Sequence, residues 1–279
     1  MNEKPLKGVK VVNLAINLPG PAAAALLADR GASVTKVEPP DGDPFEGYCP
    51  AWYRTMCHGQ TIVRLDIRVA EGRAEVERLL EDGDVMIASF RPSVLARYGL
   101  DRATLHNRYP RLCQVSIVGY PSPDQERAGH DLTYQAQTGV LSPPSLPRTF
   151  LADMACAERA AAYAVTLLYS RERGDGSGSV ELPISECAEH FAQPVRYGMT
   201  GPGATFAGAW PRYNLYETRQ GWIAIAPVEA HFWQRLRAEL GIPGEEASYE
   251  ELREVFITRS AAEWEAWARS LDLPIASVR

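Results

Sequence analysis

Several features that would identify a function directly are missing from this sequence. Its five cysteines are scattered singly among 279 residues, and no pair has the spacing of a zinc site. It contains no run of about 18 apolar residues, the length that a membrane-spanning helix needs. Its first residues do not resemble a secretory signal, which combines a basic segment with an apolar run. We therefore expect a reduced cytoplasmic protein with no membrane partner and no bound metal.

Basic residues are also too few for a nucleic-acid-binding protein. The chain has 29 Lys and Arg residues against 35 Asp and Glu residues, and its formal net charge is −6. Binding to a phosphate backbone requires a basic face, so nucleic acid is not expected as a partner. The hydrophobic content of 46% excludes a disordered chain and is enough for a sizeable core.

Glycine-rich phosphate-binding motifs are absent. No Walker loop occurs, and the first expected turn reads Asn17-Leu18-Pro19-Gly20-Pro21, which is not the glycine pattern of a dinucleotide site. The sequence therefore gives no support to ATP, NAD or FAD as a cofactor.

The first 118 residues alternate short β-branched runs with helical patterns. We expect strands at 9–14, 33–37, 85–88 and 113–118, and helices at 22–30, 70–80, 94–98 and 101–108. Strands separated by helices indicate βαβ units and a parallel sheet covered by helices on both faces. The sequence therefore predicts an α/β fold with a Rossmann-like sheet.

The remaining residues predict a second, smaller domain. Residues 119–148 are rich in Pro, Gly and polar side chains and indicate a functional loop with one short helix. The further elements expected are helices at 153–173, 183–197, 229–240, 249–256 and 260–271 and strands at 179–182 and 222–226. We predict a large domain at 1–185, a linker at 186–214 and a small α+β domain at 215–279.

Blocks of sequence, rather than any single motif, carry a family resemblance. They are, in chain order, Gly20-Pro21 with Leu26 to Asp29, Lys36 to Pro40 with Gly42 to Pro44, Leu65 to Arg68 with Glu71 to Arg73, Phe90 to Pro92 with Tyr98 to Leu100, Asn107 to Leu112, and Gly176 to Val180. Their order and spacing resemble the class III CoA-transferase (CaiB/BaiF) family, which also contains the α-methylacyl-CoA racemases.

The resemblance implies a substrate and an assembly. The substrate would be an acyl-CoA, the only cofactor would be the CoA that it carries, and the protein would form an interlocked homodimer. Family members continue for several dozen residues in a segment that returns to the first domain, and we expect that segment to be absent here.

Arginines are the candidates for binding the CoA phosphates. Arg91 precedes Pro92 at a strand-to-helix turn, where a guanidinium can bind phosphate at the carboxyl edge of the sheet. It also matches a position that contacts CoA in the family. Further CoA-binding candidates are Leu65 and Arg68, which stand in one block, and Arg97. Each arginine could instead be a solvated surface residue.

Three acid–base candidates distinguish the two branches of the family. The block Gly129 to Tyr134 resembles the racemase motif, in which the residue at His130 is the base, and Asp153 matches an aspartate shared by both branches. Glu229 matches a glutamate that supports the histidine. Taken without the resemblance, His130 could be a solvated loop residue, Asp153 a helix N-cap and Glu229 an acid favoured by a helix dipole.

Three functions remain open from the sequence. A racemase would remove and return the α-proton of an acyl-CoA through an enolate, with His130 and Asp153 as the pair and helix backbone N–H groups near Asp153 as donors to the enolate oxygen. A CoA-transferase would use Asp153 as a nucleophile and need no histidine. A non-catalytic acyl-CoA binder would explain the departures from the family pattern, such as Ser89, Gln60-Thr61 and Met154 to Ala157. We favour the racemase.

Overall fold

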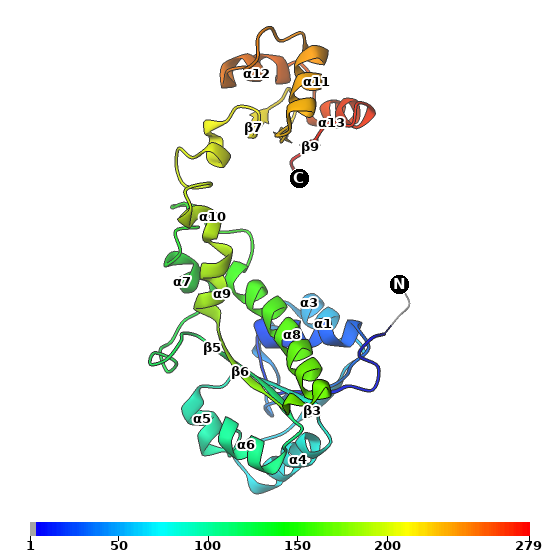
Figure 1. Cartoon of the computed structure of the whole chain (residues 1–279), viewed down its shortest axis with the longest axis vertical. Coiled ribbons are helices and arrows are strands. Elements are labelled where there is room, and N and C mark those ends of the chain that lie inside the picture. Colours follow the sequence, from blue (N-terminus) through cyan, green and yellow to red (C-terminus); the bar gives the residue numbers. More distant parts are fainter. Residues whose placement is uncertain (1–3) are drawn as a thin grey trace. The chain divides into compact units, whose positions relative to one another are not determined.

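The computed structural model of the protein describes residues 4–279, and its contacts form two compact units. Unit 1 ends at Ala192 and unit 2 begins at Gln193 (Figure 1). Each unit has its own hydrophobic core.

A six-stranded parallel sheet forms the centre of unit 1. Its strands are β1 (Lys10–Asn13), β2 (Ser33–Glu38), β3 (Thr61–Arg64), β4 (Val85–Ala88), β5 (Cys113–Val118) and β6 (Ser179–Pro183). They lie in the order β3-β2-β1-β4-β5-β6, and every neighbouring pair is parallel. The predicted α/β class with a parallel sheet is therefore confirmed. The chain order reverses between β1 and β4, the place where open α/β sheets bind ligands beyond the carboxyl ends of their strands.

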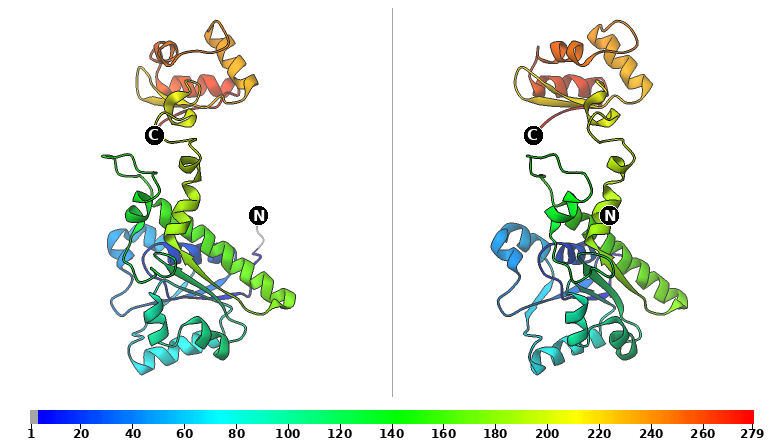
Figure 2. Two further views of the ribbon diagram at one scale, coloured as in Figure 1. Left: turned by 60° about the vertical axis from the view of Figure 1, so that its left-hand side comes forward. Right: turned by 90° about the vertical axis from the view of Figure 1, so that its left-hand side faces the viewer.

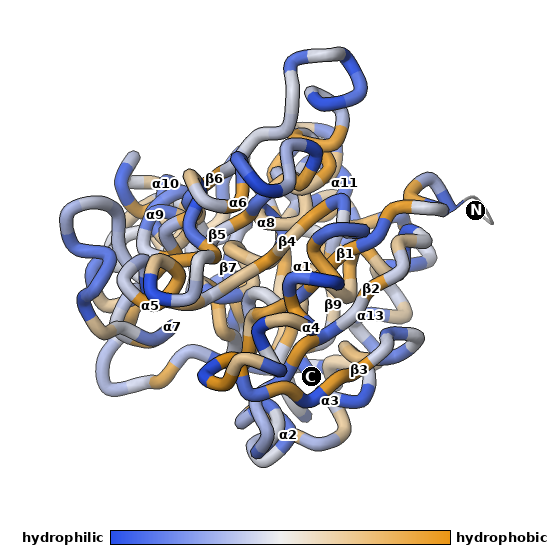
Figure 3. Tube along the Cα trace, turned by 90° about the horizontal axis from the view of Figure 1, so that it is seen from below, coloured by the Kyte–Doolittle hydropathy of each residue, from blue (hydrophilic) through white to orange (hydrophobic). Residues whose placement is uncertain are grey.

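Burial explains which strands the sequence revealed. Every residue of β4 and β5 is buried, and these strands are apolar along most of their length (Figure 3). Strands covered on both faces are expected to be continuous apolar runs. Strand β3 was not predicted, because it is an edge strand with three exposed residues out of four and little hydrophobic pattern.

Helices cover both faces of the sheet, as predicted. The helices of unit 1 are α1 (Pro19–Asp29), α2 (Pro44–Tyr48), α3 (Pro50–Met56), α4 (Ala70–Glu81), α5 (Pro92–Arg97), α6 (Arg102–Arg108), α7 (Asp131–Ala136), α8 (Leu151–Ser170) and α9 (Ile184–Phe191), with a π-helical turn η1 (Arg171–Asp175). Helices α1, α3 and α8 pack on one face and α4, α5 and α6 on the other (Figures 1 and 2). Among residues 4–279, the structure contains no helix with the length and hydrophobicity to pass through a membrane.

Small residues bring α1 close to the sheet and to α8. Helix α1 starts with Pro19 at its first position, where a missing N–H costs nothing, and its alanines are largely buried against α8. A Cβ added to Gly20 would lie 2.1 Å from the Cβ of Ala15, in the loop that leaves β1. This packing holds the β1–α1 loop, residues 14–18, at the carboxyl edge of the sheet.

Unit 1 includes helix α9, which packs along α8. The linker predicted at 186–214 therefore begins inside a helix, and the single helix predicted at 183–197 is divided into α9 and the short α10 (Gln193–Arg196). Pro194 lies at the second residue of α10, where it fits the start of a helix but not the interior of a longer one.

Unit 2 is a small α+β structure. Its antiparallel sheet has the order β7 (Asn214–Glu217), β8 (Trp222–Ile225), β9 (Ile275–Ser277), and its helices are α11 (Ala230–Leu240), α12 (Tyr249–Phe256) and α13 (Ala261–Ser270). A π-helical turn, η2 (Thr205–Ala209), precedes the sheet. Capping boxes start α12 at Ser248 and α13 at Ser260, and a core of aromatic side chains joins helices to sheet.

We predict that Gly20→Ala lowers the free energy of unfolding by about 1–3 kcal/mol, because the added methyl group would overlap Ala15. Gly47→Ala is the matched control, since Gly47 is also helical but has no atom within 4 Å of the new Cβ. The control should be neutral or stabilising by about 0.5–1 kcal/mol. Chemical denaturation of both variants checks this, and equal effects at the two glycines would contradict it.

Candidate active site

Two adjoining cavities lie at the carboxyl edge of the parallel sheet of unit 1. The first, of about 320 Å³, is lined by residues that follow β1, β4 and β5 and includes Arg91, His130 and Asp153. The second, of about 340 Å³, lies beyond the ends of β2 and β3. Ile16 and Phe90 line both cavities. The position agrees with the ligand-binding edge of an open parallel sheet.

His130 and Asp153 meet at the first cavity although they belong to different helices. His130 is the residue before α7, and Asp153 is the third residue of α8. The backbone N–H of His130 donates to Thr133 Oγ1 at 2.9 Å, which fixes the backbone of this residue. His130 is exposed and lines the cavity, so its imidazole is available to a bound molecule.

The buried carboxylate of Asp131 joins α7 to α8. Its Oδ1 accepts hydrogen bonds from the backbone N–H of Ala152 at 2.8 Å and of Asp153 at 3.1 Å, and its Oδ2 accepts from Gln135 at 2.6 Å. Asp131 therefore supplies the capping carboxylate for the start of α8, a role that was considered for Asp153. The N-cap interpretation of Asp153 was wrong, and its own carboxylate accepts no hydrogen bond from the described residues.

The same contacts correct the prediction for the enolate donors. The backbone N–H groups of Ala152 and Asp153 already donate to Asp131, and that of Met154 donates to the carbonyl of Phe150. The N–H groups of residues 152–154 are therefore not available to an enolate oxygen, and another donor in this cavity would have to replace them.

Asp153 has an unusual affinity for protons. Burial, with a smaller contribution from the negative charge of Asp131, raises the pKa of Asp153 from 3.8 to about 7. A carboxyl group with this pKa exists in both protonation states near neutral pH. It can therefore donate or accept a proton, as general acid–base catalysis requires.

Tyr134 forms a rigid wall of the cavity. Its ring packs edge-to-face on Tyr120 with centroids 5.2 Å apart, and the guanidinium of Arg127 lies 4.3 Å above the Tyr120 ring. Burial raises the pKa of Tyr134 to about 12, so its hydroxyl stays protonated. A Cβ at Gly119 or at Gly129 would come within 2.6 Å of this side chain, which explains both glycines.

The four CoA-binding candidates occupy different places. Arg91 lines the first cavity, whereas Leu65 and Arg68 line the second. Arg68 makes a two-pronged ion pair with Asp66, with N–O distances of 2.8 and 2.9 Å. Arg97 is exposed in the last turn of α5 and lines neither cavity. Their contacts with CoA remain predictions.

Glu229 belongs to unit 2. It is the exposed residue directly before α11, and its backbone carbonyl accepts the Trp233 N–H at 3.0 Å. The helix thus begins one residue later than predicted, and the support of His130 by Glu229 remains a prediction.

Three residues at the first cavity were not predicted as site residues. Asn17 and Arg127 line it, and Asp131 accepts hydrogen bonds from the start of α8, the helix that carries Asp153. Asp131 stands within the block Gly129 to Tyr134, and its position next to His130 was the available signal. No sequence pattern indicated Asn17, whose place depends on contacts far along the chain.

A larger cavity of about 570 Å³ near α6 contains His106 but none of the predicted site residues. Within residues 4–279, no group of three or more His, Cys, Asp and Glu side chains is arranged to hold a metal ion.

Comparisons with known proteins point to one family. The family model described as CoA-transferase family III matches residues 6–279. A succinate–glutarate CoA-transferase of Agrobacterium fabrum is 31% identical, over 85% of this chain and 67% of the relative. Human α-methylacyl-CoA racemase is 27% identical, over 93% of this chain and 74% of the relative.

A solved structure gives the same result. The crystal structure of a CaiB/BaiF family protein from Brucella suis superposes with a TM-score of 0.82 at 26% identity, covering 100% of this chain and 85% of that one. The relatives include both transferases and racemases, so the comparisons give the family and leave the reaction open.

Asp153→Asn should stabilise the protein at neutral and basic pH. Between about pH 4 and pH 7 the folded protein holds a proton on Asp153 that the unfolded chain has lost, so this residue lowers stability as pH rises. Asparagine cannot ionise, and we expect a gain of about 2–4 kcal/mol above pH 7 that disappears near pH 4. Denaturation at several pH values measures it, with Asp82→Asn as an exposed control. A gain that does not vary with pH would contradict the raised pKa.

Proposed function

Because the chain belongs to CoA-transferase family III, we propose that it racemises 2-methylacyl-CoA thioesters by removing and returning their α-proton. The observation that carries the proposal is the meeting of His130 and Asp153 at one cavity. Two acid–base groups at the α-carbon are what racemisation needs, whereas a transferase working through Asp153 has no use for the histidine.

The mechanism uses one group on each side of the α-carbon. The neutral imidazole of His130 accepts the α-proton, and the electron pair moves into the thioester to form an enolate. Protonated Asp153 then delivers its proton to the other face of the α-carbon. The reverse direction exchanges the two roles. A pKa of about 7 lets Asp153 take part in both directions near neutral pH.

CoA binding would use the carboxyl edge of the sheet. In this proposal Arg91 binds a phosphate group, and Leu65 and Arg68 contribute to the second cavity. Arginine suits this role because its planar guanidinium forms paired hydrogen bonds with phosphate oxygens. The chain would need no cofactor other than the CoA of its substrate.

A CoA-transferase is the second candidate. The carboxylate of Asp153 accepts no hydrogen bond from residues 4–279, so it is free to attack a thioester carbonyl. The attack would give a mixed anhydride and release CoA, whose thiolate would then attack the aspartyl carbonyl, form an aspartyl-CoA thioester and release the first acid. The second acid would attack this thioester, and the CoA set free would cleave the new anhydride at the acyl carbonyl to give the new acyl-CoA and free Asp153. The transferase from Agrobacterium fabrum among the relatives favours this alternative.

Exchange of the α-proton distinguishes these reactions. We expect the protein to replace the α-proton of a 2-methylacyl-CoA by deuterium in D₂O, observed by NMR, since the enolate is reprotonated by groups that exchange with solvent. His130→Ala should reduce the exchange at least about 100-fold, and Asp153→Ala similarly, while His58→Ala, at an exposed histidine after α3, should not.

Other results would overturn the racemase. The protein would instead be a transferase if it moves CoA to a labelled acid without exchanging the α-proton. This transfer would be retained in His130→Ala and lost in Asp153→Ala. Binding of acyl-CoA with neither reaction, across several acyl chains, would favour a non-catalytic binder.

Arg91→Ala should weaken CoA binding by about tenfold, measured by titration calorimetry, because the variant loses a charged partner of a phosphate. Arg78→Ala is the matched control, since Arg78 is an exposed arginine of α4 that pairs with Glu75. Unchanged affinity in Arg91→Ala would remove this residue from the CoA site.

We further propose that the protein is a homodimer, as the resemblance to the family implies. Light scattering at micromolar concentration is expected to give twice the mass of the chain. A monomer under these conditions would disprove this assembly.

A further inference from the structure

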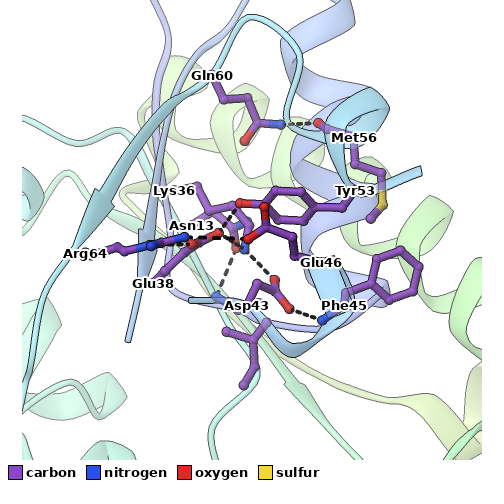
Figure 4. A network of polar contacts seen from close by, with 12 residues as sticks. Asn13, Lys36, Glu38, Asp43, Phe45, Glu46, Tyr53, Met56, Gln60 and Arg64 are labelled. Atoms are coloured by element: carbon purple, nitrogen blue, oxygen red, sulfur yellow. Dashed lines mark hydrogen bonds and ion pairs between the residues drawn. The ribbon is translucent and has the colours of Figure 1, made fainter. Parts of the chain in front are cut away.

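A cluster of charged side chains is buried beside the β1–α1 loop. Lys36 of β2 is 0% exposed and Asp43, before α2, is 4% exposed, and their Nζ and Oδ2 atoms lie 2.5 Å apart (Figure 4). Lys36 also pairs with buried Glu38 at 3.2 Å. Burying charges costs solvation free energy, so such a pair is weak evidence for stability. A role other than stability is therefore expected for the cluster.

The second oxygen of Asp43 binds the loop. Its Oδ1 accepts a hydrogen bond from the backbone N–H of Asn17 and another from that of Phe45, both at 2.9 Å. One carboxylate thus connects strand β2, the start of α2 and the loop that leaves β1. Since Lys36 holds Oδ2, the other oxygen is directed to the loop.

Asn17 is the residue that this carboxylate restrains. Its φ angle is 64°, in the left-handed region that few residues other than glycine adopt. It lines the first cavity together with His130 and Asp153. Its side-chain amide is partly buried and makes no hydrogen bond with residues 4–279, so it can donate to a bound molecule.

The remaining members of the cluster keep Lys36 and Glu38 in place. Glu38 accepts a hydrogen bond from the Tyr53 hydroxyl at 2.6 Å, and its other oxygen lies 3.5 Å from Arg64. Lys36 therefore has a fixed carboxylate on each side, which limits the positions that its ammonium group and Asp43 can take.

We propose that Lys36 and Asp43 are positioning residues that hold Asn17 at the cavity wall, where its amide donates a hydrogen bond to the thioester oxygen of an acyl-CoA. This inference rests on the proposed function for its substrate. It supplies a donor in place of the Ala152 and Asp153 N–H groups of α8, which already bind Asp131. A donor fixed before the reaction stabilises the charge that develops on this oxygen.

Two double variants test the hydrogen bonds that Asp43 Oδ1 accepts from Asn17 and Phe45. Both Lys36→Met/Asp43→Asn and Lys36→Met/Asp43→Leu remove the Lys36–Asp43 charge pair, and both take Lys36 from Glu38, so the two variants differ only at position 43. Asparagine and leucine have nearly the same shape, but only the asparagine side chain retains an oxygen that can accept the Asn17 N–H. The control, Lys10→Met/Asp82→Asn, removes an exposed ion pair.

The Leu double variant should differ from the Asn double variant in two measurements. Amide hydrogen–deuterium exchange in residues 14–18 should be faster by about tenfold or more, with little change in α4 or in unit 2. The kcat for α-proton exchange should fall about tenfold with a smaller change in KM, because Asn17 lines only the cavity that contains Asp153. The surface control should match wild type in both.

Asn17→Gly tests the donor itself. Glycine accepts the positive φ without strain, so the variant keeps the loop and loses only the amide. We expect kcat to fall about 100-fold, as for removal of an oxyanion donor. If the Leu double variant does not fold, Asn17→Gly decides the role of the amide. Lys36→Met/Asp43→Ala, which also lacks the acceptor oxygen, then takes the place of the Leu double variant in the comparison of amide exchange rates.

The outcomes separate this inference from the proposed function. Amide exchange requires no substrate, so it reports on the positioning of Asn17 even if acyl-CoA is not racemised. Equal exchange rates in the Asn and Leu double variants would overturn the positioning role. If the wild-type protein is active and its kcat is unchanged in Asn17→Gly, the donor role is overturned. If the wild-type protein is inactive but the double variants show the expected amide exchange rates, only the racemase proposal is overturned.

Discussion

The hydrogen bonds from the start of α8 to Asp131 determine most of what the first cavity can do. One carboxylate ties two helices that come from distant parts of the chain. It places His130, its neighbour in sequence, at the cavity that Asp153 also lines. Asp131 accepts hydrogen bonds from the backbone N–H groups of Ala152 and Asp153, so these donors do not bind the Asp153 carboxylate. The negative charge of Asp131 also disfavours ionisation of Asp153. Asp131 thus influences the position of Asp153 and adds to its raised pKa, of which burial is the larger cause.

The protonation of Asp153 also bears on the two reactions found in this family. Attack on a thioester requires the ionised carboxylate, whereas delivery of a proton to an enolate requires the neutral acid. With a pKa near neutrality, Asp153 is present in both its ionised and its neutral form at neutral pH. In the proposed reactions, the side chains beside Asp153 in the cavity, His130 among them, would therefore decide between the two chemistries more than Asp153 itself.

The sequence predicted the layers of unit 1 better than the contacts that organise its site. Strands such as β4 and β5 are buried apolar runs, and their pattern does not depend on distant residues. The edge strand β3 and the short helices α2 and α3 lack such a pattern. Hydrophobic periodicity therefore located the central elements and missed the peripheral ones.

At the site, the residue types were recognisable but their partners were not. His130, in the block Gly129 to Tyr134, and Asp153 stand out as acid–base residues, and both line one cavity. That Asp131 caps α8 across 21 positions, or that Asp43 binds Asn17 across 26, follows only from the folded chain. Each residue has an ordinary local explanation as a turn or capping residue. Local pattern therefore does not reveal these long-range hydrogen bonds.

The crowding of Gly119 and Gly129 by one tyrosine has a consequence for how this protein can diverge. Both glycines face the same ring, so neither can gain a side chain while Tyr134 stays in place. Replacement of Tyr134 by a smaller residue would make room for a side chain. It would also widen the cavity and remove the ring against which Tyr120, itself covered by Arg127, packs. A side chain at either glycine thus requires that the Tyr134 ring move or be replaced by a smaller residue, so the three positions are coupled through one ring.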